Sequence, residues 1–167
     1  MAAGVDLRDP MFADTTLMTE ESFIGPDNSL WQLRHTKFPV IAAVAGPCIT
    51  GGFELALNCD FIIAAKTAFF QDTHARYGIV PGGGMASVLP RSLGMHAAKW
   101  NSMVCQRMSA ERAYQLGLVA EVRAPGNDGN DRLYRCLHFL AYLIRRFKLC
   151  DGKSQMLATA SVFVPLC

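Results

Sequence analysis

The feature that most constrains the fold is a short apolar run, PVIAAVA, at residues 39–45. A continuous apolar run of this length, bounded by prolines at 39 and 47, is typical of a parallel strand buried on both faces. A glycine-containing turn at 46–52 follows it, and residues 53–58 then have the pattern of a helix. A second apolar run lies at 60–65. Strands alternating with helices predict an α/β domain with a parallel sheet.

The remaining elements are predicted from their boundary residues. A helix over 31–37 ends before Pro39, because the residue before a proline is pushed out of helical geometry. A short strand over 67–71 leads into a loop over 72–84 that ends in PGGG, and helix follows from there to residue 105 with breaks at Pro90 and Gly94. Ser109 is expected to cap the next helix, which leads through 116–119 into a short strand.

The C-terminal part contains one further predicted helix, over 132–149. Its apolar residues recur at helical spacing, which predicts packing against the domain. The basic residues at its two ends leave a helix lying on a membrane surface as the alternative. The stretch 151–167 gives no pattern from which an element can be assigned.

Composition excludes several classes of function. The 167 residues, 51% of them hydrophobic and 18% charged, fit one globular domain. The net charge of +2, with both signs mixed along the chain, gives no basic footprint for nucleic acid. No stretch reaches 18 apolar residues, so we expect no membrane span. Six dispersed cysteines and no secretory leader predict reduced thiols, no metal site and an intracellular protein, with mitochondrion, peroxisome and cytosol all open.

Two glycine-rich junctions carry the candidate functional residues. The backbone N–H of Gly51 lies at the expected start of a helix, where a free N–H and the helix dipole suit a developing oxyanion. Glu54 falls in the first turn of that helix, either to complement the dipole or to act as acid or base. His74 lies just before the glycine-rich loop, where a structural and a catalytic role are both open.

Four motifs, taken in order, resemble the crotonase (enoyl-CoA hydratase/isomerase) superfamily. They are AAGVDLR at 2–8, KFPVIAAVAG and TGGFELALNCD at 37–46 and 50–60, GIVPGGG at 78–84, and RMSAERAYQLGLV at 107–119. The resemblance implies a crotonase-like (ClpP/crotonase) α/β spiral of ββα units that lacks the usual N-terminal units. Residues 1–122 would form this core, incomplete at its N-terminus, and residues 123–167 a divergent helical C-terminal segment.

The resemblance also implies a substrate. It would be an acyl-CoA or enoyl-CoA thioester, with no cofactor besides the coenzyme A of the substrate itself, handled by a homo-oligomer built as a trimer or a dimer of trimers. The backbone N–H groups of Val5 and Gly51 would form the oxyanion hole for a thioester enolate. Arg8 would lie near the CoA phosphates, where a cation suits the anionic nucleotide. The substrate-binding positions implied are Ala3, Val5, Asp6, Leu7, Arg8 and Gly51.

The implied catalytic pair departs from the hydratase pattern at one position. Hydratases use two glutamates; Glu54 matches the first, and the second position falls on His74. The string DTHAR at 72–76 resembles a sub-branch of the family, and a histidine titrates near neutral pH and so can act as acid or base. Asp72 is the weaker candidate for this role. The predicted function is enoyl-CoA hydratase or isomerase; the alternative is a catalytically silent crotonase-fold protein that binds acyl-CoA or a partner subunit, or a non-functional fragment.

Overall fold

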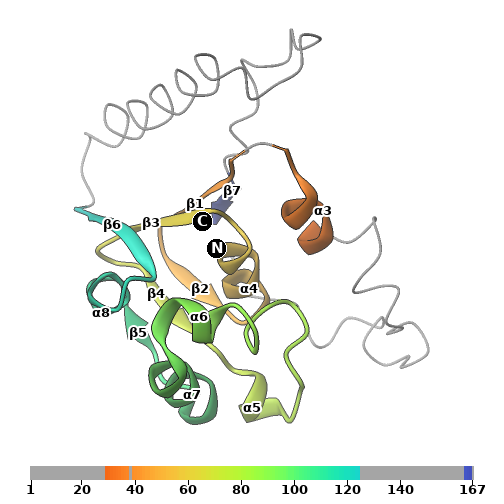
Figure 1. The fold of residues 1–167 in the computed structure, drawn as a ribbon. Helices are drawn as coiled ribbons and strands as arrows, with labels where there is room; N and C mark the ends of the chain where they lie inside the picture. Colours follow the sequence, from red (N-terminus) through yellow and green to blue (C-terminus); the bar gives the residue numbers. More distant parts are fainter. Residues whose placement is uncertain (1–28, 38, 125–163, 167) are drawn as a thin grey trace, which may run out of the picture.

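The computed structural model describes residues 29–37, 39–124 and 164–166, which form two small sheets with helices around them (Figure 1). After the first helix, strands and short helices follow one another along the chain. The elements in chain order are α3 (Ser29–His35), β1 (Ile41–Val44), β2 (Pro47–Ile49), α4 (Gly51–Leu57), β3 (Phe61–Ala65), β4 (Phe69–Gln71), α5 (His74–Tyr77), α6 (Leu89–Leu93), α7 (Met95–Val104), β5 (Met108–Ser109), α8 (Ala110–Gln115), β6 (Val119–Arg123) and β7 (Val164–Leu166).

The larger sheet has four strands in the order β6-β3-β1-β7, and all of its pairs are parallel. The central strands β1 and β3 are the two apolar runs of the sequence, paired with Ile41 opposite Phe61, and most of their residues are buried. Burial on both faces explains why these strands are apolar throughout rather than alternating. Both strand predictions are confirmed. Strand β7 pairs with β1, within a stretch for which the sequence predicted no element.

The smaller sheet has the order β2-β4-β5 and corrects one prediction. Residues 47–49, expected to be part of a turn, form strand β2, which pairs in parallel with β4. Pro47 is the first residue of this strand, a position where the missing N–H is tolerated. The pairing depends on a partner more than twenty residues away, as in Cys48 opposite Phe70, so local turn residues could not indicate it.

The segment after the glycine-rich loop was expected to be helical from its start, but residues 85–88 form turns and the first helix, α6, begins at Leu89. The break at Gly94 is confirmed, since Gly94 separates α6 from α7 with a φ of 78°. The break at Pro90 is wrong, because Pro90 lies in the first turn of α6, where a backbone N–H would have no partner in the helix and its absence from proline costs nothing. Ser109 caps α8 as predicted, its hydroxyl accepting from the backbone N–H of Arg112 at 3.2 Å. The loop predicted over 72–84 contains the single-turn helix α5.

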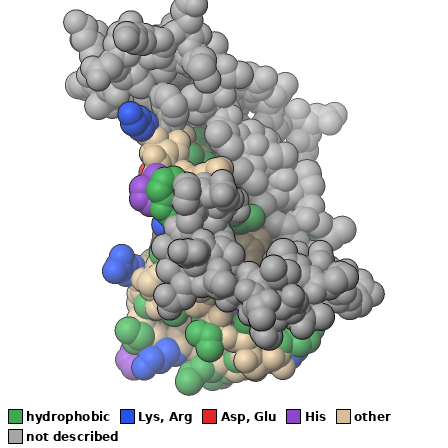
Figure 2. Space-filling view, turned by 90° about the vertical axis from the view of Figure 1, so that its right-hand side faces the viewer, with side chains coloured by type: hydrophobic (Ala, Val, Ile, Leu, Met, Phe, Trp, Pro, Cys, Tyr) green, Lys and Arg blue, Asp and Glu red, His purple; other side chains and the backbone are tan. Residues whose placement is uncertain are grey.

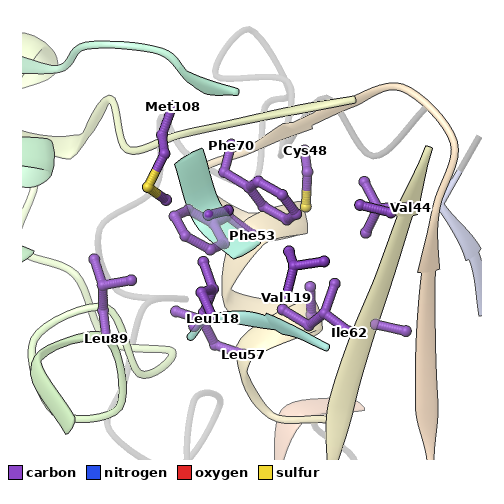
Figure 3. Packing of buried hydrophobic residues seen from close by; sticks show 14 of the residues in the cluster. Val44, Cys48, Phe53, Leu57, Ile62, Phe70, Leu89, Met108, Leu118 and Val119 are labelled. Atoms are coloured by element: carbon purple, nitrogen blue, oxygen red, sulfur yellow. The ribbon is translucent and has the colours of Figure 1, made fainter. Parts of the chain in front are cut away.

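The hydrophobic core joins the two sheets through α4. The rings of Phe53 and Phe70, both fully buried, have centroids 5.2 Å apart and are tilted by 49°. Figure 3 shows these two rings side by side, with Met108 and Cys48 next to them. Phe53 precedes Glu54, and Phe70 lies shortly before His74, so this aromatic contact fixes the spacing of the two elements that carry the candidate residues.

The described surface is mixed in character. Figure 2 shows separate hydrophobic side chains at the end of the molecule where α5 and α7 lie in Figure 1. On α7, the most exposed large apolar residues are Trp100 and Met103. Within the described ranges, no helix has the length and apolar character needed to cross a membrane, and no three metal-binding side chains come together.

Several predictions fall on residues outside the described ranges. These are the oxyanion and substrate-binding positions of the N-terminal motif, Ala3, Val5, Asp6, Leu7 and Arg8, and the helix over 132–149. The predicted boundary at 122–123 between the core and the C-terminal segment falls at the end of β6, which is Arg123.

Candidate active site

Gly51 opens helix α4 directly after strand β2, two residues earlier than the sequence predicted. Its backbone N–H therefore has no carbonyl partner within the helix, as for every residue of a first helical turn. Thr50 precedes it with a φ of 48°, so the chain turns sharply from β2 into α4. The strand, the turn and the helix thus place a donor without an intrahelical partner at the position where the sequence predicted one.

Glu54 is buried on α4, with 6% of its surface exposed. A buried carboxylate must be hydrogen-bonded to offset its lost hydration. Here Oε1 accepts from the backbone N–H of Gly83 at 2.8 Å and from that of Met85 at 3.3 Å. Glu54 is therefore not simply a solvated carboxylate that complements the helix dipole. The carboxylate faces the glycine-rich loop, and that loop holds one of its oxygens.

The loop at Gly83 is tightly enclosed. A Cβ at position 83 would lie 2.6 Å from Glu54 Oε2 and 2.6 Å from Leu30 Cδ1, so only glycine fits. The carbonyl of Gly83 accepts from Asn58 Nδ2 at 2.6 Å and from Arg34 Nη2 at 3.2 Å. Arg34 Nε donates in turn to Asn58 Oδ1 at 2.5 Å. Gly83 is thus held through both its N–H and its carbonyl, which fixes the N–H that binds Glu54.

His74 opens α5 and is held by Asp72. The imidazole, 8% exposed, places Nδ1 2.7 Å from Asp72 Oδ1, and the backbone N–H of His74 donates to the same oxygen at 3.0 Å. The hydrogen bond with Asp72 raises the pKa of His74; burial opposes this rise, and the charges of Asp72 and Glu54 add to it. The net result is a histidine with a raised pKa.

Asp72 shows the opposite change. Burial acts to raise the pKa of this carboxyl, but hydrogen bonds from the His74 side chain, the Ser102 hydroxyl and the His74 amide, together with the charge of His74, lower its pKa below the usual value. An ionised carboxylate can only accept hydrogen bonds, so Nδ1 of His74 carries a hydrogen and donates it to Asp72. The other ring nitrogen, Nε2, is the one left to meet a reacting group.

The structure brings Glu54 and His74 together. His74 Nε2 lies 3.9 Å from Glu54 Oε2, and both side chains are less than one tenth exposed. On each residue, one polar atom is held by the protein, Oε1 by the loop and Nδ1 by Asp72, while the second polar atom faces the other residue. A buried carboxylate and a buried imidazole arranged in this way can take up and deliver protons at neighbouring atoms of one small substrate.

Sequence reasoning missed part of this arrangement. Arg34 and Asn58 carried no prediction, and Asp72 was considered only as a substitute for His74 rather than as its partner. The available signal was the Asp-x-His spacing, since an aspartate readily bonds the backbone two residues further on. No comparable signal exists for Arg34, which reaches Gly83 across 49 residues of sequence.

The arrangement of strands and helices is that of a crotonase-type α/β protein, and comparison with known families agrees. A sequence model described as Enoyl-CoA hydratase/isomerase matches residues 1–140. The chain therefore belongs to the enoyl-CoA hydratase/isomerase family and has the crotonase fold.

Individual relatives support the same assignment over part of their length. A probable peroxisomal enoyl-CoA hydratase of Arabidopsis thaliana is 41% identical over 95 residues, which are 57% of this chain and 36% of that protein. A probable enoyl-CoA hydratase of Rhizobium meliloti is 36% identical over 74% of this chain and 47% of its own. The crystal structure of an enoyl-CoA hydratase subunit from Geobacillus kaustophilus superposes with a TM-score of 0.73 at 34% identity, over 83% of this chain and 52% of that one. The chain thus spans about half the length, or less, of these relatives.

Proposed function

We propose that this chain hydrates an enoyl-CoA thioester, adding water across the double bond next to the thioester carbonyl. The observation that carries the proposal is that Glu54 Oε2 and His74 Nε2 lie 3.9 Å apart, both side chains being buried and each held through its other polar atom. The names of the relatives, which are enoyl-CoA hydratases, support the substrate class.

The thioester carbonyl would be bound at the start of α4. The N–H of Gly51 is directed there by its place in the first turn, and the N–H of Val5 is proposed as the second donor. Two such donors stabilise the negative charge that develops on the oxygen when the thioester becomes an enolate. We propose Ala3, Asp6, Leu7 and Arg8 as the accompanying substrate-binding positions, with Arg8 near the CoA phosphates.

We assign the acid–base roles from the atoms of the pair that the protein leaves available. Glu54 takes a proton from water while the water oxygen bonds to the β-carbon. His74, whose pKa is raised by its hydrogen bond with Asp72 and by the charges of Asp72 and Glu54, delivers a proton from Nε2 of its protonated form to the α-carbon as the enolate collapses. The proton gained by Glu54 then returns to His74. Their 3.9 Å separation is short enough for one bridging water, or a rotation of either side chain, to carry this proton.

Further properties are proposed on the family resemblance. We propose a trimer or dimer of trimers inside a cell compartment, with a core over 1–122, and a reaction that needs neither metal nor cofactor beyond the CoA of the substrate. Sedimentation of the purified chain tests the assembly. Turnover that is unchanged by a chelator supports the metal-free reaction, and turnover abolished by it contradicts that part of the proposal.

The function is tested with crotonyl-CoA on the purified chain. Titration calorimetry measures binding, and loss of the ultraviolet absorbance of the conjugated thioester measures hydration in the same sample. Saturable binding with turnover supports the proposal. Binding without turnover indicates the catalytically silent alternative, and conversion of a 3-enoyl-CoA without hydration indicates an isomerase. A cooperatively folded sample that does neither contradicts both a hydratase and an acyl-CoA-binding protein.

A further inference from the structure

A strained backbone residue lies directly before Gly51. Of the described residues other than glycine, Thr50 and Cys105 have positive φ. Cys105, with φ 54° and ψ 34°, occupies the ordinary left-handed region. Thr50, with φ 48° and ψ −108°, lies in a region that glycine adopts readily and a β-branched residue does not. Something must hold Thr50 in this conformation, because such strain persists only where the surroundings over-determine it.

Thr50 is held in this conformation by hydrogen bonds to the segment that carries His74. The backbone N–H of Thr50 donates to the carbonyl of Gln71 at 2.9 Å. Its hydroxyl hydrogen-bonds to the hydroxyl of Thr73 and also accepts from the backbone N–H of Thr73 at 3.2 Å. Three hydrogen bonds thus link the residue before Gly51 to residues on either side of Asp72. We refer to the two hydroxyl-mediated bonds as the Thr50–Thr73 bridge.

The bridge continues the β2–β4 pairing, which ends with Ile49 opposite Gln71 and the bond from Thr50 to Gln71, one step further toward Gly51 and His74. Glu54 meets His74 without a direct hydrogen bond, at 3.9 Å. Gly51 follows Thr50 and His74 follows Thr73, so the bridge sets the distance between the proposed oxyanion donor and the imidazole. Catalytic groups must keep such distances to within about 0.5 Å to remain productive.

We propose that Thr50 is a positioning residue whose hydroxyl, bonded to Thr73, fixes the Gly51 turn relative to His74. The inference rests on the proposed function, because it concerns the geometry between two groups of that site. A glycine at position 50 would relieve the backbone strain but would remove the hydroxyl. The presence of threonine there, in a conformation suited to glycine, is accounted for by the bond that the side chain makes.

The activity test separates this role from simple stabilisation. Thr50→Ala and Thr73→Val each remove one hydroxyl, whereas Thr50→Ser and Thr73→Ser keep both. We expect the alanine and valine variants to lower kcat for crotonyl-CoA about tenfold, with KM changed less than about twofold, because misplacing a catalytic group acts on the reaction step. Both serine variants should keep the wild-type kcat. The kcat of the double variant, Thr50→Ala with Thr73→Val, should be no lower than that of the slower single variant, because both substitutions break the same Thr50–Thr73 bridge.

Thr50→Gly provides a sharper form of the same test. In Thr50→Gly the backbone strain at position 50 is relieved, which offsets the loss of the hydroxyl's hydrogen bonds. The unfolding midpoint of this variant should therefore not lie below that of Thr50→Ala, while its kcat should still fall about tenfold. Thr67→Val is the matched control, since Thr67 is exposed and its hydroxyl donates to the carbonyl of Ala45, at 3.3 Å, and is not part of the Thr50–Thr73 bridge. Lowered stability in the hydroxyl-deleting variants with kcat unchanged would overturn the proposal, leaving the bridge with no role beyond holding Thr50.

A measurement that needs no turnover keeps this proposal separable from the proposed function. Amide hydrogen exchange is read on the far side of the bridge, at the N–H of His74 in Thr50→Ala and at the N–H of Thr50 in Thr73→Val. Both N–H groups are hydrogen-bonded in the wild type, and we expect each to exchange about tenfold faster in the variant. A chain without hydratase activity that shows this coupling contradicts the function and supports the bridge as a mechanical link. Unchanged exchange in both variants contradicts the bridge.

Discussion

The two sides of the candidate site are held in different ways. On the α4 side, Glu54 is fixed by backbone N–H groups of the glycine-rich loop, and that loop is itself gripped through the carbonyl of Gly83. On the α5 side, His74 is fixed by another titratable side chain, Asp72. Backbone donors keep their hydrogen at every pH, whereas the Asp72–His74 contact depends on the charge of both partners.

This difference teaches which changes each side should tolerate. The Glu54 side depends on shape, because the N–H must reach Oε1 and any Cβ at position 83 would intrude on Oε2. The His74 side depends on charge, because the histidine has a raised pKa and the aspartate a lowered one. Substitutions that change the shape of the Glu54 side should therefore lower activity equally at every pH. Substitutions that change the charge of the His74 side should have effects that depend on pH.

The largest expected effect is that of Glu54→Gln. Glutamine keeps an oxygen for the N–H groups of Gly83 and Met85, so the fold and substrate binding should survive. It cannot take up a proton, so the hydration rate should fall about 10²-fold or more. Steady-state kinetics with crotonyl-CoA measure this, with Glu111→Gln, an exposed carboxyl in the first turn of α8, as the matched control. Intact activity in Glu54→Gln would falsify the assigned mechanism.

A smaller loss is expected for His74→Ala, about tenfold, because water can partly replace a proton donor that the site lacks. The loss should be mainly in kcat and greatest below the raised pKa of His74, where the wild-type imidazole is protonated. His96→Ala is the matched control, since His96 is exposed on α7. Equal kcat for the two alanine variants across the pH range would return His74 to a structural role.

Sequence reasoning reached these two residues because each has a fixed spacing from a glycine motif. It also reached β1 and β3, because strands buried on both faces produce continuous apolar runs. It missed β2, which is three residues long and exists through its pairing with β4. It also missed α5, a single turn of four residues, which is too short to produce a helical period.

The residues that hold Glu54 and the Gly51 turn in place could not be predicted from the sequence, for a different reason. Arg34 and Asn58 meet at Gly83 from positions 24 residues apart in the chain, and only the tertiary fold brings them together. Thr50 has a backbone conformation that no sequence rule assigns to threonine. Spacing therefore indicated which residues carry the proposed chemistry, while the residues that hold them in place became visible only in the structure.

The shape of the Glu54 side is tested by Gly83→Ala, for which we expect about a fivefold to tenfold loss of kcat. The added Cβ must displace both the Glu54 and the Leu30 side chains, and overpacking of this kind also costs about 1–3 kcal/mol of stability. Gly46→Ala is the control, because a Cβ there would meet nothing within 4 Å. The loss should be the same at every pH. A loss confined to one limb of the pH profile would show that shape is not what Gly83 supplies.

The smallest expected effect is the pH dependence of stability on the His74 side. The pKa of His74 is raised, so its stabilising contribution is complete below its ordinary value of about 6.5 and is lost as pH rises through the raised value. The pKa of Asp72 is lowered, so its contribution is complete above about 3.8 and is lost as pH falls through the lowered value. Asp72→Asn should therefore destabilise the chain most between about pH 4 and 6.5, by about 1–2 kcal/mol, the difference between a charged and a neutral hydrogen bond.

Urea unfolding of the wild type and of Asp72→Asn at pH 5.5 and pH 8.5 measures this loss of stability. A difference in stability as large at pH 8.5 as at pH 5.5 would mean that Asp72 holds His74 by shape, as Gly83 holds Glu54, and the contrast between the two sides would disappear.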